Sequence, residues 1–343
     1  MPDQAMAGEI LLHWLKFDIR THSLDFLPWV QALYGSNDLR LQFPGRAACV
    51  RLQIERLGSA HALPIVPLPS GVFAETRVLT SPCFYQDGRF QSFQTAGYIH
   101  EFEYDAHRHT IRCNLGGEFL RSGRLVASHF LRPLLQSFVL PFYGMKWLHG
   151  ALLARGSRTF FLTGGGGAGK STTALALLEH GYSLLSEDGP LFFLEGGEDY
   201  VLSSLDFPHV GTDTLRRLPF LRPHVLGEMD DRGKFPIARS LLNGHGDDRQ
   251  PRRVTHLLVL ERMPKVTKPT LIPLERREVL HKMVAEAMVV FRTLRGRDSC
   301  LPLDQYSGFV FDLITRLVSR AEVFRLRFAD AQLDQVAELL DRL

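Results

Sequence analysis

The sequence is poor in the features that would assign it quickly to a class of proteins. Its 343 residues include only four cysteines, Cys49, Cys83, Cys113 and Cys300, and no two of them have a Cys-x-x-Cys spacing. Scattered thiols of this kind fit a reducing compartment better than a disulfide framework or a structural zinc site.

Long apolar runs and a charge bias are lacking as well. The longest nearly apolar stretch, residues 134–145, is short and contains Gln136, Ser137 and Pro141, so no segment is expected to span a membrane. The 40 basic residues nearly balance the 37 acidic ones, which leaves a net charge of +3 and no long basic run for nucleic acid. The N-terminus carries acidic side chains where a signal peptide has basic ones. We therefore expect a cytoplasmic protein without nucleic-acid or membrane partners.

The length predicts two domains. Residues 1–124 alternate apolar and polar side chains between turn sequences, and residues 98–115 form the clearest hairpin. We interpret 1–124 as a β-rich N-terminal domain that recognises a substrate or partner. In residues 125–140 the apolar pattern predicts a buried helix that ends before Pro141.

The hairpin contains a cluster of potential metal ligands. These residues are His100, Glu101, Glu103, Asp105, His107 and His109. His100 and His109 could face each other across the hairpin, but the cluster is split between the two faces of the strands. A charged, exposed hairpin is the favoured interpretation.

Residues 125–343 are expected to form an α/β domain, because strands alternate with helices around a glycine loop. Two close strands at 149–155 and 158–164 predict an antiparallel hairpin. A helix over 170–180 should end at Gly181. Further expected elements are a strand ending at residue 185, a hairpin over 191–204, an irregular segment over 206–250, a buried strand at 255–262, helices at 276–295 and 305–320, a late strand at 323–328, and a closing helix capped by Asp330.

The glycine loop matches the phosphate-binding pattern G-x-x-x-x-G-K-[ST] in full. Its residues are Gly164, Gly165, Gly166, Gly167, Ala168, Gly169, Lys170 and Ser171. The glycines let the backbone curl so that N–H groups face phosphate oxygens, and the following helix adds about half a positive charge at its N-terminus. Lys170 would reach the β- and γ-phosphates, and the Ser171 hydroxyl would bind Mg²⁺. The pattern therefore predicts binding of ATP with Mg²⁺.

Two carboxylates follow the next strand. Glu187 and Asp188 are expected at the sheet edge where the phosphate loop also lies, since that edge is formed by the carboxyl ends of parallel strands. Either could bind Mg²⁺ or accept a proton from an attacking hydroxyl. The sequence has neither an Asn-Lys-x-Asp motif for guanine nor a Leu-Ser-Gly-Gly-Gln segment of transporter ATPases. These absences count against switch and motor proteins.

Residues 147–188 resemble the core of HPr kinase/phosphorylase and its relatives. The shared order is a His-Gly on one strand, a hairpin turn, the phosphate loop, a short helix ending in Gly and an acidic pair, and residues 323–340 resemble the C-terminal part of that family more loosely. The resemblance implies a kinase domain of mixed sheet and flanking helices. It also implies that Thr172 assists in binding ATP, that His149 lies near the catalytic acid, and that Asp188 deprotonates a substrate serine. Glu187 stands where the family has an aspartate.

The sequence also departs from that family. Residues 196–222 lack the Glu-[Ile/Leu]-Arg-Gly-Leu-Gly-Ile segment of HPr kinases, which argues against HPr as the acceptor and against the reverse, phosphorylase reaction. Relatives of this type include kinases that modify a serine of a ribosomally made precursor peptide. Further along, Lys234 lies in a Gly-containing loop where it could reach the transferred phosphate, with Arg239 in support.

The sequence therefore predicts a P-loop serine kinase that transfers the γ-phosphoryl group of ATP to a protein or peptide. A kinase for a small hydroxylated molecule and a nucleotide-binding regulatory ATPase remain as alternatives. The sequence also leaves open whether the chain forms a homo-oligomer, and which of Glu187 and Asp188 is the base.

Overall fold

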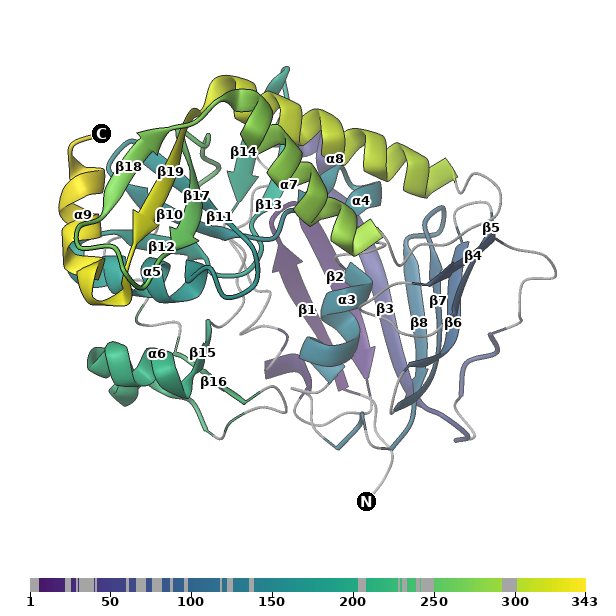
Figure 1. Ribbon diagram of the computed structural model, residues 1–343. Coiled ribbons are helices and arrows are strands. Elements are labelled where there is room, and N and C mark those ends of the chain that lie inside the picture. The colour runs from purple at the N-terminus through teal and green to yellow at the C-terminus, as the bar shows by residue number, and fades with distance from the viewer. Residues whose placement is uncertain are drawn as a thin grey trace. The chain divides into compact units, whose positions relative to one another are not determined.

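The computed structural model has a mixed α/β fold whose described residues divide into two compact units (Figure 1). It describes residues 6–21, 26–28, 30, 40, 42–59, 62–65, 72–75, 82–86, 89–95, 98–117, 119–121, 126–135, 139–202, 208–227, 229, 233–238, 241, 250–291 and 301–343. The first unit comprises 1–146 and 288–308, and the second comprises 147–287 and 309–343. The boundary expected after residue 124, and the recognition role of residues 1–124, stay predictions.

The first unit is built on one eight-stranded sheet of order β1-β2-β3-β8-β7-β6-β5-β4. Its strands are β1 (Met6–Leu12), β2 (Leu15–Thr21), β3 (Ala48–Arg56), β4 (Val72–Glu75), β5 (Pro82–Gln86), β6 (Arg89–Thr95), β7 (Tyr98–Asp105) and β8 (Thr110–Leu115). β3 pairs in parallel with both β2 and β8, and the other neighbours are antiparallel.

The hairpin of β7 and β8 forms as expected, but it is not an exposed, charged hairpin. His100, Glu103 and Asp105 are all buried. Glu103 accepts hydrogen bonds from Arg89 and from Gln91 of β6, so its charge is compensated inside the sheet. His100 pairs in register with Leu115 rather than with His109. Among the described residues, no group of three or more His, Cys, Asp or Glu side chains is placed to hold a metal ion.

His100 predicts a pH dependence of stability. Its side chain is fully buried beside the rings of Phe102 and Phe130, and burial lowers its pKa from 6.5 to about 4. The folded protein favours the neutral ring. The contribution of neutral His100 to the free energy of unfolding is therefore fully present above pH 6.5 and is lost as the pH falls towards 4. The loss amounts to roughly 3 kcal/mol. We expect His100→Phe to reduce the fall in unfolding free energy between about pH 7.5 and about pH 4.5 by roughly 2 to 3 kcal/mol, as measured by urea denaturation.

The matched control for this measurement is His107→Phe, because His107 is exposed at the hairpin turn. It should show the same pH dependence as the wild-type chain. An unchanged pH dependence in His100→Phe would contradict the assignment to His100.

The described residues of the segment 125–140 are helical, as the apolar pattern predicts. A wide helical turn covers Val126–Leu131, followed by α3 (Arg132–Leu134) and, after residues outside the described part, α4 (Leu140–Phe142). Pro141 does not end the helical segment as expected, because it lies in the first turn of α4, where the missing N–H would have no partner anyway.

The second unit is built on a six-stranded sheet of order β12-β10-β11-β17-β19-β18. Its strands are β10 (Ala151–Arg155), β11 (Arg158–Thr163), β12 (Ser183–Ser186), β17 (His256–Arg262), β18 (Thr270–Pro273) and β19 (Glu322–Phe328). β11, β17 and β19 are parallel, whereas β10 is antiparallel to both β11 and β12. The hairpin of β13 (Leu191–Glu195) and β14 (Glu198–Leu202) also forms as expected, and β9 (Met145–Trp147) spans the division between the units.

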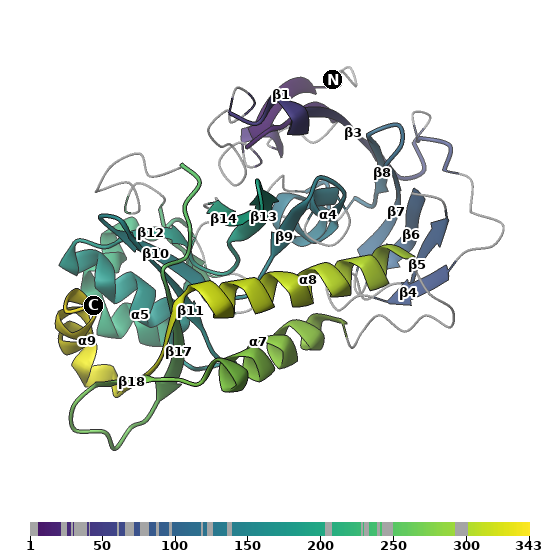
Figure 2. The ribbon, with the colours of Figure 1, turned by 90° about the horizontal axis from the view of Figure 1, so that it is seen from above.

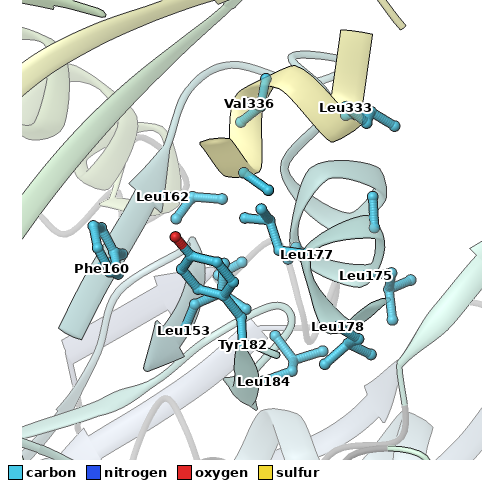
Figure 3. Close-up of a cluster of buried hydrophobic side chains, with 14 of the residues drawn as sticks. Leu153, Phe160, Leu162, Leu175, Leu177, Leu178, Tyr182, Leu184, Leu333 and Val336 are labelled. Carbon is cyan, nitrogen blue, oxygen red and sulfur yellow. The ribbon is translucent and has the colours of Figure 1, made fainter. Parts of the chain in front are cut away.

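One face of this sheet carries an apolar core, part of which is shown in Figure 3. Phe160 and Leu162 of β11 and their neighbours on β10, β17 and β19 point to this face, because paired residues of adjacent strands share a side. The helices α5 (Lys170–Ala176) and α9 (Leu333–Asp341) pack on it. A tighter turn, Leu177–His180, extends α5 to Gly181, whose φ of 81° ends the helix as predicted.

The opposite face is more polar. The alternate residues of β17 and β19, Glu261, Arg325 and Arg327, form ion pairs there. The helix α7 (Arg276–Phe291) packs on this side through Glu278, which pairs with Arg325. Figure 2 shows α5 and α7 on opposite sides of β11 and β17. The remaining long helix is α8 (Leu301–Arg320), and no helix of the described residues is long and apolar enough to cross a bilayer.

The segment 206–250 contains more regular structure than the sequence predicts. Its described part forms β15 (His209–Gly211), α6 (Thr212–Arg217), a helical turn over Pro219–His224, and β16 (Lys234–Pro236), which pairs with β15. Three-residue strands have no readable alternation, so they could not be recognised. Val210, Leu218, Leu221 and Ile237 anchor this segment in the apolar core.

Asp330 does not cap the closing helix. Its carboxylate instead pairs with the guanidinium groups of Arg217 and Arg262. The N-cap position before the first helical turn is Ala329, whose N–H donates to the Gln332 side chain. Charged donors bind a carboxylate more strongly than a helix N–H does, which accounts for the difference.

Candidate active site

The sheet topology brings the predicted site residues to one edge. β11, β17 and β19 run in parallel, and β12 runs the same way because both β11 and β12 are antiparallel to β10. The phosphate loop follows β11, the acidic pair follows β12, and His149 precedes β10 at the same edge. Three segments that are separate in the sequence thus meet at one place, as expected for the carboxyl edge of such a sheet.

The glycines of the phosphate loop have conformations that other residues rarely adopt. Gly164, Gly167 and Gly169 have φ values of 148°, 79° and 90°. A Cβ at Gly164 would lie 3.1 Å from the Leu260 carbonyl oxygen, and one at Gly169 would lie 3.3 Å from the Phe328 ring. The loop is therefore packed between α5 and the ends of β17 and β19.

Lys170 is the first residue of α5, and its side chain is buried under the loop. Its Nζ donates hydrogen bonds of 2.5 Å to the Gly164 carbonyl and 3.2 Å to the Gly165 carbonyl. Burial lowers the pKa of Lys170, while the carboxylates of Glu286, Asp188 and Glu187 act in the opposite direction. The ammonium group is thus held under the loop, where the motif would bring it to a phosphate.

The next two residues of α5 bind polar side chains from other segments. The Ser171 hydroxyl donates a hydrogen bond to Oε1 of Glu187, whose side chain is buried. The Thr172 hydroxyl lies 3.1 Å from that of Thr214 on α6. A hydroxyl and a carboxylate are both hard oxygen donors of the kind that Mg²⁺ prefers, so Ser171 and Glu187 fit this ion chemically.

His149 and Asp188 are in contact at the same edge. The Nδ1 atom of His149 lies 2.9 Å from Oδ1 of Asp188, and both side chains are partly exposed. The two adjacent carboxylates therefore have different partners: Glu187 bonds to the hydroxyl of the phosphate-loop serine, and Asp188 pairs with the histidine. From the residues alone, either carboxylate could be the base, and only the family resemblance favours Asp188.

Gly189 fixes the turn that carries the acidic pair. The Trp147 indole lies so close that a Cβ at Gly189 would be 1.4 Å from its Nε1 atom. The Trp147 ring is also next to His149, at 6.0 Å between centroids. The indole therefore contacts both the turn after Asp188 and the histidine that pairs with Asp188.

We expect Gly189→Ala to displace the indole and the Asp188 turn. The added methyl group should destabilise the second unit by about 1 to 3 kcal/mol, because a well-packed site has no space for it. Thermal unfolding measures this loss. Gly211→Ala is the matched control, since its Cβ would have no heavy atom within 4 Å. Equal stability of the two variants would contradict this account of Gly189.

Glu286 is a site residue that sequence reasoning missed. Thr163, the residue before the loop, donates a 2.9 Å hydrogen bond to Oε2 of Glu286 on α7. Glu286 is also the carboxylate with the largest effect in raising the Lys170 pKa against burial. It lies outside every recognised motif, and a single Glu in a helical pattern gives no signal of such a contact.

Lys234 lies in β16, opposite Gly211 of β15 in the pairing register. Its charge contributes to lowering the Lys170 pKa, so it lies within electrostatic range of the phosphate loop. Arg239, which was expected to support it, lies outside the described residues. The residues from Gly165 to Gly167 are exposed at the tip of the loop.

Comparisons with known proteins do not assign this chain to a family. No protein-family model matches it, and no curated protein matches its sequence. Among solved structures, that of the Hpr(Ser) kinase/phosphatase from Coxiella burnetii is partly similar, with 14% sequence identity and a TM-score of 0.28. The match covers 58% of this chain and 93% of that one. A likeness this weak establishes no shared function.

Proposed function

We propose that this chain is an ATP-dependent kinase that phosphorylates a hydroxyl group, most naturally a serine of a protein or peptide. The observation that carries the proposal is the meeting of three groups at one sheet edge. These are the phosphate loop with Lys170, the Ser171–Glu187 contact, and the His149–Asp188 pair. A phosphate-binding loop alone is compatible with any nucleotide-binding protein, but the His149–Asp188 pair adds a base beside the loop.

In this proposal each group has its own part. The N–H groups of residues 164–172 and the Lys170 ammonium would bind the phosphates and neutralise charge on the γ-phosphoryl group. Ser171 and Glu187 would hold Mg²⁺, which neutralises charge between the β- and γ-phosphates. Lys234 would supply a further cation near the transferred group.

Asp188 would act as the base in the transfer. It would accept the proton of the acceptor hydroxyl while that oxygen forms a bond to the γ-phosphorus and the bond to the β-phosphate oxygen breaks, which releases ADP. His149 would orient the Asp188 carboxylate through its Nδ1 contact. This assigns Glu187 to the metal and Asp188 to proton transfer, because Glu187 accepts the hydrogen bond of the phosphate-loop serine and Asp188 contacts His149.

The acceptor class depends on the resemblance of residues 147–188 to HPr kinase relatives. The test is incubation with γ-labelled ATP, Mg²⁺ and a cell extract, followed by separation of proteins, peptides and small molecules. Label on a serine of a protein or peptide would support the proposal. Label on a small molecule alone would indicate a metabolite kinase, and free phosphate alone would indicate a regulatory ATPase.

A further inference from the structure

The contacts around the phosphate loop indicate the direction in which a bound triphosphate runs. Three of the groups proposed to act at the γ-phosphate, Glu187, Asp188 and His149, come from β12 and the start of β10. In the sheet these two strands lie on one side of β11, and β17 and β19 lie on the other. Because the nucleoside is attached to the opposite end of the triphosphate, it is expected on the side of β17 and β19.

Arg262 is the last residue of β17 on that side. It pairs in register with Phe328 of β19, so the two side chains point to the same face of the sheet. The Phe328 ring contacts the Gly169 position immediately before α5. Arg262 therefore projects on the α5 face, beside the start of the phosphate-binding helix.

Arg217 reaches the same place from α6. Thr214, three residues earlier on this helix, contacts the Thr172 hydroxyl on α5. Residues three apart lie on the same helix face, so Arg217 is next to this contact. The guanidinium groups of Arg217 and Arg262 both bind Oδ2 of Asp330. About one third of each of the three side chains is exposed, at 34%, 35% and 30%.

This cluster has the chemistry of a base-binding surface. Two guanidinium groups share one carboxylate, so a net positive charge remains and both planes are held in place by the same anion. A guanidinium plane stacks on the face of an aromatic ring and keeps N–H donors at its edge. The ion pairs alone would account for two arginines that hold Asp330 at the surface. They would not account for the position of both arginines beside the first turn of α5.

We propose that Arg217 and Arg262, positioned by Asp330, bind the nucleoside end of ATP, with their guanidinium planes against the purine ring. This inference rests on the proposed kinase function and assigns the part of the nucleotide that the phosphate loop does not contact. It predicts that the two arginines contribute to affinity for ATP but not to affinity for its phosphates.

The experiment measures the affinities of two ligands, ATP and inorganic triphosphate, by isothermal titration calorimetry in the presence of Mg²⁺. Arg217→Lys and Arg262→Lys keep the charge and can still bind Asp330, but they lose the planar group. Each should weaken ATP binding about tenfold and leave triphosphate binding unchanged within about twofold. Arg320→Lys is the matched control, because this arginine forms a comparable ion pair with Glu198 on β14. It should change neither affinity.

The outcomes separate this inference from the function on which it rests. An equal loss for both ligands would make the arginines a phosphate clamp and overturn the inference, as would unchanged affinities in both variants. Failure of the wild-type chain to bind either ligand would overturn the proposed kinase function as well. Thermal unfolding of each variant confirms that a lost affinity does not come from a lost fold.

Discussion

Lys170→Ala is expected to lower ATP turnover about a hundredfold to a thousandfold, the range found when one preorganised donor to a developing charge is removed. The ammonium group is buried under the phosphate loop and bonded to the Gly164 and Gly165 carbonyls. Its removal takes away a cation for the phosphates and two bonds that hold the loop backbone. The effect on ATP binding is measured by calorimetry, and the effect on turnover is measured by the release of ADP.

Lys268→Ala is the matched control for this variant, because it removes the same charge from an exposed position. It should retain both ATP binding and turnover. Thermal unfolding shows whether Lys170→Ala keeps its fold. Turnover equal to that of the wild-type chain would remove Lys170, and with it the whole phosphate site, from the mechanism.

Asp188→Asn is expected to lose phosphoryl transfer by a factor of about 10² to 10⁴ while ATP still binds. An amide has nearly the same shape as a carboxylate, and it can still contact Nδ1 of His149, but it cannot take a proton from a hydroxyl. The prediction is therefore a fall in kcat with little change in the Kd for ATP. Single-turnover transfer of label to the acceptor measures the first quantity, and calorimetry measures the second.

The control for this variant is Asp213→Asn, an exposed carboxylate in the first turn of α6 that pairs with Arg216. It should leave the transfer rate unchanged. Unimpaired transfer in Asp188→Asn would exclude Asp188 as the base and return that role to Glu187. A parallel loss of ATP binding would instead assign Asp188 to the metal and phosphate side of the site.

The parts of the site that could be predicted from sequence are the local ones. The β10–β11 hairpin, the glycine loop and the helix ending at Gly181 follow one another along the chain, and each has a strong turn or cap signal. The convergence of the acidic pair with the loop was also predictable, because the edge of a parallel sheet places successive strand ends together.

The contacts between distant segments could not be predicted. Glu286 meets Thr163 across 123 positions, and no periodic pattern marks a helix residue that reaches a loop on another element. Asp330 has a sequence context typical of a helix cap, yet it binds two arginines that only the folded chain brings to it. In residues 206–250, pairing of two three-residue strands creates structure that neither strand would indicate alone.

The packing of the glycine loop against β17 and β19 also has a consequence for the order of synthesis. The complete G-x-x-x-x-G-K-[ST] segment leaves the ribosome well before Leu260 and Phe328, the residues against which Gly164 and Gly169 rest. Non-local contacts of this kind form only after the intervening chain is made. A nascent chain therefore carries the whole motif for a long interval without the loop geometry seen here, and ATP should first bind when the last strand joins the sheet.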